Sequence, residues 1–429
     1  MELKEKKNDR LKGEVMIPGD KSISHRSIIL GSLANGRSRI KGFLESEDCL
    51  NTLNAFREMG VQIERVGDKE YIIDGVGLRG LKEPDCILDC GNSGTSMRLL
   101  IGFLAAQDFY SVLSGDASLR QRPMKRIIKP LTKMGAMIWS REGGYAPLSI
   151  EGRSLSGIDY QLPVASAQVK SSILLAGLYS DQEVKIVEPA LSRDHTERML
   201  SGFGIDIKME GYQIILPVDN NRRLYPQEIE VPGDISSAAF FITAGLITKG
   251  SEILLKDIGV NPTRSGFLDV VRDMGGEIKI INQREVSGEP IADIRVKSSQ
   301  LKGIEISGEI IPKLIDEIPI IAVLASQAEG ETIIKDASEL RVKETDRIAA
   351  MVSQLSNLGV EIEELSDGMI INGPARIKGG VKVDSYGDHR IAMSLAIAGL
   401  VAKSEITILN TQVINTSFPD FKGRLLSLK

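Results

Sequence analysis

The sequence predicts a mixed α/β (α+β) protein with two similar domains, each containing three βαβαββ repeats. Two observations lead to this prediction. A junction between a short strand and a helix rich in small and apolar residues recurs six times, about 70 to 80 residues apart. The tripeptide PGD occurs at residues 18–20 and again at 232–234, and divides the six units into two sets of three. We therefore expect residues 1–17 plus 234–429 to form a discontinuous domain, and residues 18–233 to form a domain inserted within it.

The elements follow the same order in each unit. The six junctions are PGDKSISHR (18–26), CGNSGTSMR (90–98), PVASAQVKS (163–171), PGDISSAAF (232–240), IPKLIDEIP (311–319) and SYGDHRIAM (385–393). A second helix then stops at an apolar residue followed by Gly, which favours the left-handed conformation after a helix. These stops are Met59-Gly60, Met134-Gly135, Phe203-Gly204, Met274-Gly275 and Leu358-Gly359. Alternating segments such as VQIERV and VEIEEL follow and predict paired strands.

The two ends of the chain look incomplete by this pattern. The sixth unit stops after its second helix, and the chain begins with a strand at residues 15–17 that lacks a unit of its own. We expect the two ends to complete one another.

Composition narrows the function classes. The chain has 429 residues, of which 42% are hydrophobic and 26% charged, with a net charge of −5. An acidic balance argues against a nucleic-acid partner. No apolar run approaches the roughly 20 residues that span a bilayer, so we expect no membrane partner and a cytoplasmic location.

Cysteine and histidine usage argues against a metal centre. Cys49, Cys86 and Cys90 are too few and too irregularly spaced for a disulfide framework or a zinc site, and we expect free thiols. The three histidines do not form a pair with ligand spacing. We expect neither a bound metal nor a cofactor.

The junction at residues 18–26 predicts an anion site at a helix N-terminus. Asp20 or Ser22 can cap the helix, and the N–H groups of its first turn favour negative charge. Lys21 supplies a compact charge, and Arg26 supplies a planar fork that can hold a phosphate or carboxylate with two parallel hydrogen bonds. Ser22 and Arg26 are four residues apart and share a helix face. A capped surface helix with solvated charges is the alternative for this stretch taken alone.

The other helix starts add similar groups. We predict one helix over LRVKETDRIAAMVSQLSNLG (340–359), with Lys343 and Arg347 on one face of its charged first turn and Glu344 beside them. A salt-bridged helix start is the alternative, although cations oppose the helix dipole there. Residues Asp388 to Arg390 predict a comparable charged helix start. The alternative interpretation is a single solvated arginine beside a helix cap.

Three further segments supply neutral or acidic groups. Asn92 to Thr95 combines a Gly with small hydroxyls, which suits close approach of an anion to the backbone. Ser166 to Gln168 supplies neutral donors, or else simply the start of a core helix. Asp316 and Glu317 precede a strongly apolar helix, where one of them, partly removed from water, is suited to act as a base. Pooled together, the helix starts predict one cationic cleft.

These motifs resemble the 5-enolpyruvylshikimate-3-phosphate synthase family from about residue 11 to 425. The matching segments, in order, are PGDKSISHR, GNSGTSMR, RQRPM, SAQVKS, IDEIP, RVKETDR, YGDHR and TSFPDF. The resemblance implies two inside-out α/β barrels, with helix N-termini facing a cleft between the domains. It implies transfer of the enolpyruvyl group of phosphoenolpyruvate to the 5-hydroxyl of shikimate 3-phosphate, with release of phosphate, in the shikimate pathway to chorismate and the aromatic amino acids. It also implies an enzyme without a cofactor, and we expect a monomer.

The resemblance assigns site residues by position. The residues expected to bind shikimate 3-phosphate are Lys21, Ser22, Arg26, Ser166, Ala167, Gln168, Arg193, Asp316 and Lys343. Those expected to hold phosphoenolpyruvate are Lys21, Gly94, Arg122, Gln168, Arg347 and Arg390. The catalytic residues implied are Asp316 as base for the hydroxyl, Glu344 as proton carrier at C3, and Lys21. Cationic side chains offset the substrate charge, so no metal is required.

Two departures from the family pattern stand out. Many relatives have Lys before the TFPD segment, where this chain has Thr416, so one phosphoenolpyruvate contact differs. SAQVK and RDHTE resemble the branch associated with tolerance to the inhibitor glyphosate, whereas Gly94 resembles the sensitive pattern.

The sequence leaves two alternative functions. A UDP-N-acetylglucosamine enolpyruvyl transferase shares the fold but carries a cysteine in its lid loop, and residues 111–123 contain none. A non-catalytic sensor of shikimate 3-phosphate or a similar phosphosugar would not need both Asp316 and Glu344.

Overall fold

The computed structural model describes all 429 residues and divides into two compact units. Unit 1 contains residues 1–18, 232–285 and 290–429, and unit 2 contains residues 19–231 and 286–289. Each unit is described by itself below. We propose that these units correspond to the two domains expected from the sequence.

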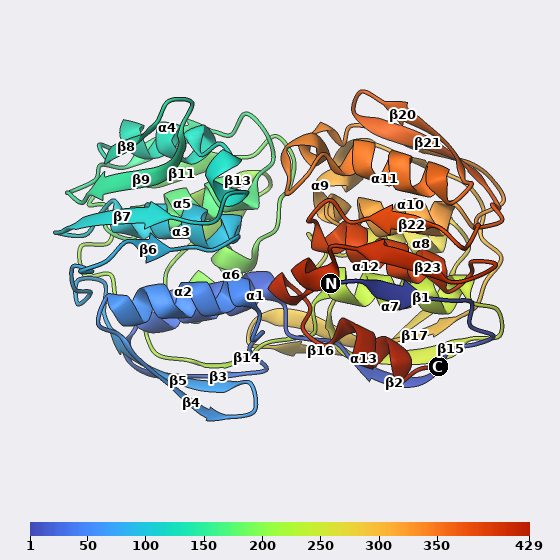
Figure 1. The fold of residues 1–429 in the computed structure, drawn as a ribbon. Helices are drawn as coiled ribbons and strands as arrows, with labels where there is room; N and C mark the ends of the chain where they lie inside the picture. Colours follow the sequence, from blue (N-terminus) through green and yellow to red (C-terminus); the bar gives the residue numbers. More distant parts are fainter. The chain divides into compact units, whose positions relative to one another are not determined.

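Unit 2 repeats one order of elements three times (Figure 1). One repeat consists of β14 (Glu228–Glu230), α1 (Lys21–Leu33), β3 (Asn35–Lys41), α2 (Glu47–Glu58), β4 (Gln62–Gly67) and β5 (Glu70–Val76). The next consists of β6 (Leu88–Asp89), α3 (Gly94–Leu104), β7 (Tyr110–Ser114), the 3₁₀ turn η1 (Leu119–Gln121), α4 (Lys125–Lys133), β8 (Met137–Arg141) and β9 (Tyr145–Glu151). The last consists of β10 (Ile158–Gln161), α5 (Ala167–Gly177), β11 (Val184–Val187), α6 (His195–Gly202), β12 (Lys208–Glu210) and β13 (Gln213–Leu216).

Each repeat of unit 2 forms one four-stranded sheet. The strand orders are β14-β3-β5-β4, β6-β7-β9-β8 and β10-β11-β13-β12. In every sheet the first two strands are parallel and the other neighbours are antiparallel. A parallel pair needs a crossover connection, which α3 and α5 supply in their repeats. The first strand of the α1 repeat comes instead from the far end of the unit, as β14.

Unit 1 is built from the same elements. Its first repeat consists of β2 (Lys12–Met16), α7 (Ile235–Ile247), β15 (Glu252–Gly259), α8 (Gly266–Asp273), β16 (Glu277–Val286) and β17 (Glu289–Lys297). The second consists of β18 (Glu305–Ile306), η2 (Gly308–Ile310), α9 (Ile311–Leu314), α10 (Ile318–Ala325), β19 (Gly330–Ile334), η3 (Ser338–Val342), α11 (Arg347–Asn357), β20 (Glu361–Leu365) and β21 (Gly368–Gly373). The third consists of β22 (Lys382–Asp384), α12 (His389–Gly399), β23 (Ile406–Leu409), η4 (Thr411–Thr416), α13 (Phe421–Leu426) and β1 (Leu3–Glu5).

The chain ends meet in the last sheet of unit 1. The sheets run β16-β17-β15-β2, β18-β19-β21-β20 and β1-β23-β22. Strand β1 pairs antiparallel with β23, with Leu3 opposite Ile408. The strand before Pro18 is β2, which lies parallel to β15 in a different sheet. The ends therefore complete one another, but through residues 3–5 rather than through the strand at residues 15–17.

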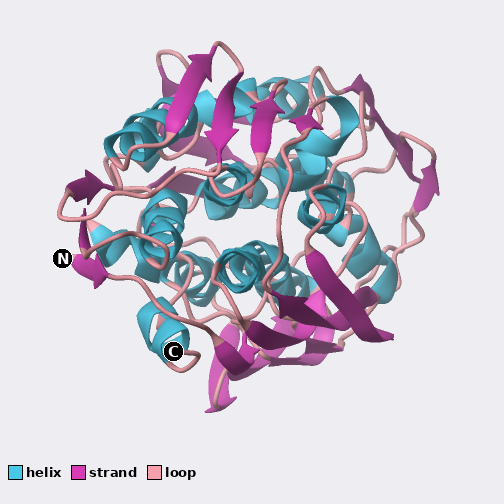
Figure 2. Cartoon of the chain, turned by 90° about the vertical axis from the view of Figure 1, so that its right-hand side faces the viewer, coloured by secondary structure: helices cyan, strands magenta, loops and turns pink.

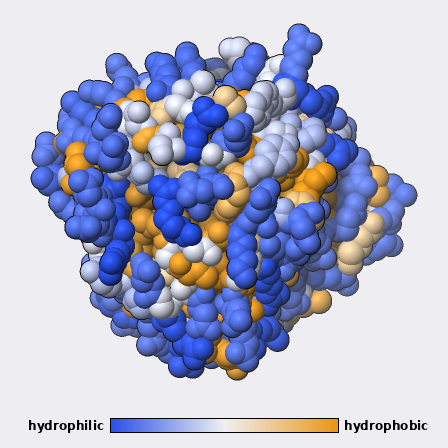
Figure 3. Space-filling model, turned by 90° about the vertical axis from the view of Figure 1, so that its left-hand side faces the viewer, coloured by the Kyte–Doolittle hydropathy of each residue, from blue (hydrophilic) through white to orange (hydrophobic).

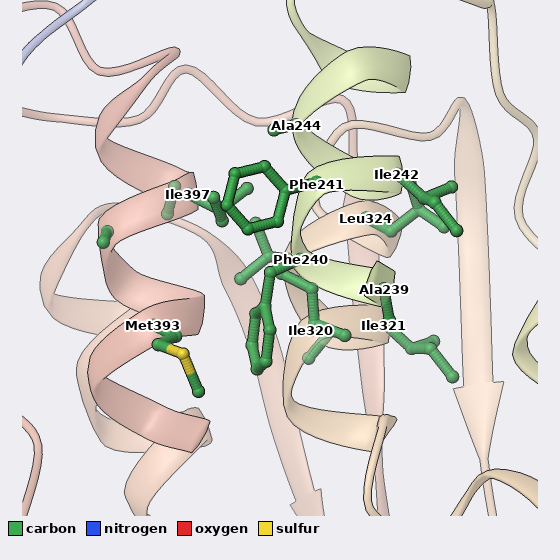
Figure 4. Packing of buried hydrophobic residues seen from close by; sticks show 14 of the residues in the cluster. Ala239, Phe240, Phe241, Ile242, Ala244, Ile320, Ile321, Leu324, Met393 and Ile397 are labelled. Atoms are coloured by element: carbon green, nitrogen blue, oxygen red, sulfur yellow. The ribbon is translucent and has the colours of Figure 1, made fainter. Parts of the chain in front are cut away.

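The first helix of each repeat is buried. In unit 1, every residue of α10 and α12 and nearly every residue of α7 is buried. Figure 4 shows Phe240, Ile320 and Met393 packed in the core, one from each helix. Figure 2 shows helices of this unit inside and strands at the periphery. A helix that is apolar all round must be covered on all sides, so sheets enclose the helices and the predicted mixed α/β fold is confirmed.

The predicted stops of the second helices are confirmed. Gly60, Gly135, Gly204, Gly275 and Gly359 each follow a second helix and have φ between 83° and 100°. Only Gly adopts this conformation without steric cost, so these residues end the helices where the sequence indicated.

One predicted helix start is wrong. Helix α11 begins at Arg347, so Lys343 and Glu344 lie before it and not in its first turn. The Asp346 carboxylate accepts a hydrogen bond from the Ala349 N–H (3.0 Å) and caps the helix there. Capping by Asp346 places the acidic group at the positive end of the helix dipole and leaves the preceding cation outside it.

The face of unit 2 in Figure 3 carries mostly hydrophilic side chains, with apolar ones between them. Among the helices, none combines the length and the apolar character that spanning a bilayer requires.

The burial of the cysteines gives a testable prediction. Cys49 and Cys90 are buried, burial raises the pKa of Cys49 to about 12, and Cys86 is exposed. Because the thiolate is the reactive form, a disulfide reagent should label one thiol in the native protein and three after denaturation. Rapid labelling of more than one thiol under native conditions would contradict this burial pattern.

Candidate functional site

In unit 2, three buried helices begin with small polar caps. The Asp20 carboxylate accepts from Ile23 N–H (2.9 Å) at α1, and the Ser93 hydroxyl accepts from Ser96 N–H (3.0 Å) at α3. Ser166 precedes α5, where its hydroxyl lies 3.5 Å from the Val169 nitrogen. Each cap satisfies one N–H of the first turn and leaves others for an anion. The predicted Lys21, Ser22, Gly94, Ala167 and Gln168 all lie in the first turns of these helices.

Lys21 lies against a carboxylate that the sequence did not single out. Its ammonium forms an ion pair with the carboxylate of Asp48 from α2, and the side chains of both residues are largely buried. Beside it, His25 is fully buried, with Nδ1 2.8 Å from the Thr52 hydroxyl. Burial, with added repulsion from Lys21 and Arg26, lowers the pKa of His25 well below its ordinary value. His25 is therefore a neutral part of the core and adds no charge to the site.

Arg26 is a buried cation held by neutral oxygens. Its Nε donates to the Thr196 hydroxyl (2.6 Å), Nη2 donates to the Ser171 hydroxyl (2.9 Å) and Nη1 donates to the Ser22 carbonyl (2.9 Å). Burial lowers the pKa of Arg26 to about 10, against the opposing influence of Glu197 and Asp20. The guanidinium is therefore charged at neutral pH, and no carboxylate touches it.

Behind Arg26, one lysine binds two glutamates away from water. Lys170 Nζ lies 2.8 Å from a Glu188 oxygen and 2.6 Å from a Glu197 oxygen, and all three side chains are about 1% exposed. Burial alone would lower the pKa of Lys170, but the two carboxylates outweigh it and raise the pKa. Arg193 precedes the same helix as Glu197, and its charge is close enough to lower the pKa of Arg26. Arg26 and Arg193, two cations of the set expected to bind shikimate 3-phosphate, are thus neighbours.

The α3 and α5 starts are joined through Gln168. Its carbonyl accepts from Arg98 Nη1 (2.6 Å) and its amide donates to the Thr95 hydroxyl (2.9 Å). Both hydrogen bonds orient the amide, so the Gln168 side chain has a defined direction.

Arg122 reaches the start of α3 from the loop after η1. Its guanidinium donates to the Asn92 side-chain oxygen (2.7 Å), the Asn92 carbonyl (3.2 Å) and the Ser118 hydroxyl (3.2 Å). A methyl group on Gly94 would lie 3.5 Å from Arg122 Nη1 and 2.9 Å from Arg98 Nη1. Gly94 is therefore packed directly beside two guanidinium groups.

In unit 1, Arg347 bridges three carboxylates. Its Nε donates to Asp388 (2.8 Å), Nη1 to Asp316 (3.2 Å) and Nη2 to Glu344 (2.7 Å). Burial alone would lower the pKa of Arg347, but these three carboxylates outweigh it and raise the pKa. Glu344 thus contacts Arg347 as the sequence suggested, although not through a shared helix turn.

The sequence predicted that Asp316 or Glu317 is partly removed from water at the start of an apolar helix, and the two residues differ in this respect. Asp316 lies 3.3 Å from Lys343 Nζ as well as 3.2 Å from Arg347, so it faces cations and not an apolar helix end. The neighbouring Glu317 is the carboxylate that is removed from water. It accepts from the Ser236 hydroxyl and lies 3.5 Å from Arg390, and is 1% exposed. The polypeptide turns between the two residues, so adjacent carboxylates have opposite environments.

Arg390 belongs to the same cluster. Its Nη1 donates to the Asp316 backbone carbonyl (2.9 Å), and the α7 cap Asp234 adds to the negative charge nearby. Asp234 is itself paired with Arg264 (2.9 Å). The starts of α7, α10, α11 and α12 are therefore linked by ion pairs and hydrogen bonds.

Thr416 does not add a charge to this cluster. Its hydroxyl donates to the Val413 carbonyl (2.8 Å) within η4. Downstream, Phe418 and Phe421 pack on Phe241 of α7 with ring centroids 5.7 Å apart, so this segment anchors the C-terminus in the core.

Potential metal ligands gather in one exposed place. Glu58, Asp85 and Cys86 lie together on the surface of unit 2, where Cys86 Sγ and a Glu58 oxygen are 3.6 Å apart. Exposed groups of this kind are common without an ion, and we assign no metal site to them.

Comparisons with known proteins show the family of this chain. Residues 5–425 match the family described as EPSP synthase (3-phosphoshikimate 1-carboxyvinyltransferase). The chain belongs to the EPSP synthase family. A 3-phosphoshikimate 1-carboxyvinyltransferase from Geobacter metallireducens is 58% identical over 412 residues, covering 96% of this chain and 95% of that protein. One from Magnetococcus marinus is 55% identical over 420 residues, covering 97% and 94%.

Solved structures give the same result for the fold. An EPSP synthase from Acinetobacter baumannii superposes with a TM-score of 0.89 at 48% identity, covering 100% of this chain and 98% of that one. The enolpyruvyl transferase NikO from Streptomyces tendae has a TM-score of 0.81 at 16% identity, covering 100% and 97%, and shares the fold. The matching family is not that of the alternative UDP-N-acetylglucosamine enolpyruvyl transferase.

In this member of the EPSP synthase family, sequence reasoning missed the residues that hold the site in place. Asp48 and Thr196 lie in the first turns of the second helices α2 and α6, Arg98 and Ser171 lie one turn into α3 and α5, and all four act through contacts between helices. Arg98 and Ser171 fall inside the quoted motifs GNSGTSMR and SAQVKS, so only their roles were missed. Asp48 carries no local signal, because it meets Lys21 only after α1 and α2 pack.

The buried Lys170 cluster gives a stability prediction. Lys170→Met should destabilise the fold by about 3 to 5 kcal/mol, because it leaves buried carboxylates without a cation. Burial raises the pKa of Glu197. At low pH this carboxylate can therefore take up a proton, which removes the cost of burying its negative charge. The loss should therefore shrink as the pH falls, as measured by urea unfolding at several pH values.

A surface lysine provides the control. Lys185 lies 3.7 Å from Asp159 in a largely exposed pair, and Lys185→Met should cost less than about 1 kcal/mol. Equal losses in the two variants would show that the Lys170 cluster does not contribute through burial.

Proposed function

We propose that the helix starts described above bind the two substrates of the family reaction and carry its proton transfers. As a member of the EPSP synthase family, the chain is a transferase of the shikimate pathway. It moves the enolpyruvyl group of phosphoenolpyruvate to the 5-hydroxyl of shikimate 3-phosphate and releases phosphate. The observation that supports the site assignment best is Arg347, which contacts both residues assigned to acid and base.

The shikimate 3-phosphate groups follow from charge and shape. Arg26 and Arg193 are neighbouring cations that suit a phosphate dianion, and Arg26 has no carboxylate contact to compete with one. Neutral donors suit the hydroxyls of the ring. The full set proposed is Lys21, Ser22, Arg26, Ser166, Ala167, Gln168, Arg193, Asp316 and Lys343.

The phosphoenolpyruvate groups are mainly arginines. Arg122 lies beside Gly94, which has no side chain to block a small anion, and Arg347 and Arg390 are held by buried acids. A guanidinium with a fixed orientation binds carboxylate or phosphate with two parallel hydrogen bonds. The set proposed is Lys21, Gly94, Arg122, Gln168, Arg347 and Arg390. Thr416 offers no cation, so the arginines carry this charge without the lysine found in many relatives.

The chemistry needs an acid and a base. Asp316 accepts the proton of the 5-hydroxyl as its oxygen bonds to C2 of phosphoenolpyruvate, and Glu344 delivers a proton to C3. The product is a tetrahedral phospholactoyl intermediate. The C2–O bond to phosphate then breaks, and the methyl group returns its proton as the double bond forms again. Each proton transfer of this kind contributes about 10²- to 10⁴-fold.

The cations have a second role in this scheme. Positive charge from Lys21, Arg122, Arg347 and Arg390 offsets the phosphate and carboxylate of the substrates and the charge that develops on the departing phosphate. Lys21 remains the third catalytic residue of the proposal. One chain supplies every group of the proposed site, which is consistent with a monomer. The proposal also includes a cytoplasmic location.

A phosphate-release assay tests the function. Purified protein with both substrates should release phosphate, and omission of either should abolish release. Binding of shikimate 3-phosphate without turnover would instead identify a sensor. Light scattering during the same preparation tests the monomer.

Glu344→Gln tests the proton carrier. The amide keeps the shape of the side chain but cannot supply the acid, so kcat should fall by at least about 10²-fold while both substrates still bind. Isothermal titration and solvent-deuterium incorporation into the enol methylene measure the two effects. Incorporation at the wild-type rate would assign the proton to another group.

Gly94→Ala tests discrimination between phosphoenolpyruvate and the longer inhibitor glyphosate. Wild-type inhibition should be competitive with phosphoenolpyruvate. The new methyl would lie 2.9 Å from Arg98 Nη1, which is held on Gln168, so the wall beside Arg122 must shift. Such overpacking costs about 1 to 3 kcal/mol, and the inhibition constant should rise more than the Michaelis constant for phosphoenolpyruvate.

Gly202→Ala is the matched control, since a methyl there meets nothing within 4 Å. It should leave both constants unchanged. A parallel rise of the two constants in Gly94→Ala would show that Gly94 does not discriminate by length.

A further inference from the structure

We infer that Thr196 and Ser171 are positioning residues that fix the Arg26 guanidinium without neutralising it, so that its charge is kept for an anionic group of shikimate 3-phosphate. The inference rests on the proposed function of Arg26 and assigns a role to two residues outside the proposed substrate sets.

The two hydroxyls imitate a carboxylate. Thr196 Oγ1 accepts from Nε and Ser171 Oγ accepts from Nη2, which is the side of the guanidinium that usually receives both oxygens of one carboxylate. The two hydroxyl oxygens are 2.6 Å apart and hydrogen-bonded to each other. Two neutral oxygens therefore stand where an acid would stand, and they set the plane of the guanidinium.

Counting donors shows what remains for a ligand. A guanidinium has five N–H groups. Thr196, Ser171 and the Ser22 carbonyl take three of them, one from each nitrogen. One N–H on Nη1 and one on Nη2 have no protein acceptor. These two N–H groups can donate to an anionic group of a ligand.

Three helices fix this arrangement. Arg26 lies on α1, Ser171 on α5 and Thr196 on α6, and all three side chains are buried. Small rotations of the guanidinium would break a hydrogen bond to one helix or another. The orientation is therefore set before a ligand arrives, which reduces the entropy lost on binding.

Charge compensation comes from a distance. Glu197, the carboxylate with the largest favourable effect on Arg26, is bound to Lys170 and does not touch the guanidinium. Lys170 and Arg26 carry two positive charges, and Glu188 and Glu197 carry two negative ones. Arg26 is thus stable as a cation, yet an incoming anion has no carboxylate to displace.

The contrast with Arg347 supports this interpretation. Arg347 has carboxylates on all three nitrogens, so an incoming anion must compete with them. Hydroxyls orient Arg26 without that competition.

The test compares variants of nearly equal shape. Thr196→Val and Ser171→Ala should each raise the dissociation constant for shikimate 3-phosphate roughly tenfold or more, measured by calorimetry on the full-length protein. The Michaelis constant for shikimate 3-phosphate should rise in parallel. The Michaelis constant for phosphoenolpyruvate and kcat at saturation should change less than twofold. Thr196→Ser keeps the hydroxyl and should bind as wild type does.

Ser172→Ala is the matched control. Ser172 is the next residue of α5, equally buried, and its hydroxyl has no hydrogen-bond partner. It should change neither constant. The double variant Thr196→Val with Ser171→Ala should lose less than the product of the two single effects, because the hydroxyls act as one unit.

Three results would overturn the inference. Wild-type affinity in Thr196→Val would do so, as would an equal loss in Thr196→Ser and Thr196→Val. A loss in kcat or in phosphoenolpyruvate binding as large as that for shikimate 3-phosphate would indicate a general structural role. Arg26→Met distinguishes the binding role of Arg26 from the positioning role of the two hydroxyls. If Arg26→Met still binds shikimate 3-phosphate as wild type does, the proposed role of Arg26 itself fails. If Arg26→Met loses affinity but Thr196→Val does not, only the positioning role is refuted.

Discussion

The site depends on keeping charged groups at the starts of buried helices. A guanidinium or ammonium taken out of water must be paired or hydrogen-bonded, and each cation here meets that requirement differently. Lys21 and Lys170 pair with acids, Arg347 shares three carboxylates, and Arg26 relies on hydroxyls and distant acids. These partners determine which cations are already neutralised and which keep charge for a ligand.

The inverted architecture explains why helix starts can carry this chemistry. Because the helices lie inside each unit and the sheets outside, the backbone N–H groups at one end of a buried helix form a fixed positive end. Asp20, Ser93, Ser166, Asp234 and Asp388 cap five of the six first helices with short side chains, and Glu317 stands at the same place in the sixth. Short caps satisfy the first turn without filling the space in front of it. Each repeat therefore contributes a buried helix whose positive end is capped by a short side chain or, in one case, has Glu317 at that place.

Neighbouring residues differ in role according to which helix they meet. Asp316 and Glu317 are adjacent, yet Asp316 faces Lys343 and Arg347 while Glu317 is buried against Ser236. The same holds on α5, where Ser171 bonds to Arg26 and Ser172 bonds to nothing. Contacts between helices, and not the residue type, give these neighbouring residues different surroundings.

The sequence by itself determined the repeats, the six helix starts, the glycine stops and the identity of the groups at the starts. These are local signals: a cap, a break or a left-handed glycine acts on its own neighbours in the chain. The tertiary structure decided the rest. It placed the start of α11 at Arg347, paired Lys21 with Asp48, completed the last sheet with β1, and set Thr196 beside Ser171 and Arg26. Such contacts join residues far apart in the sequence, and their energies come from burial and from complementary charge, which exist only after the helices have packed.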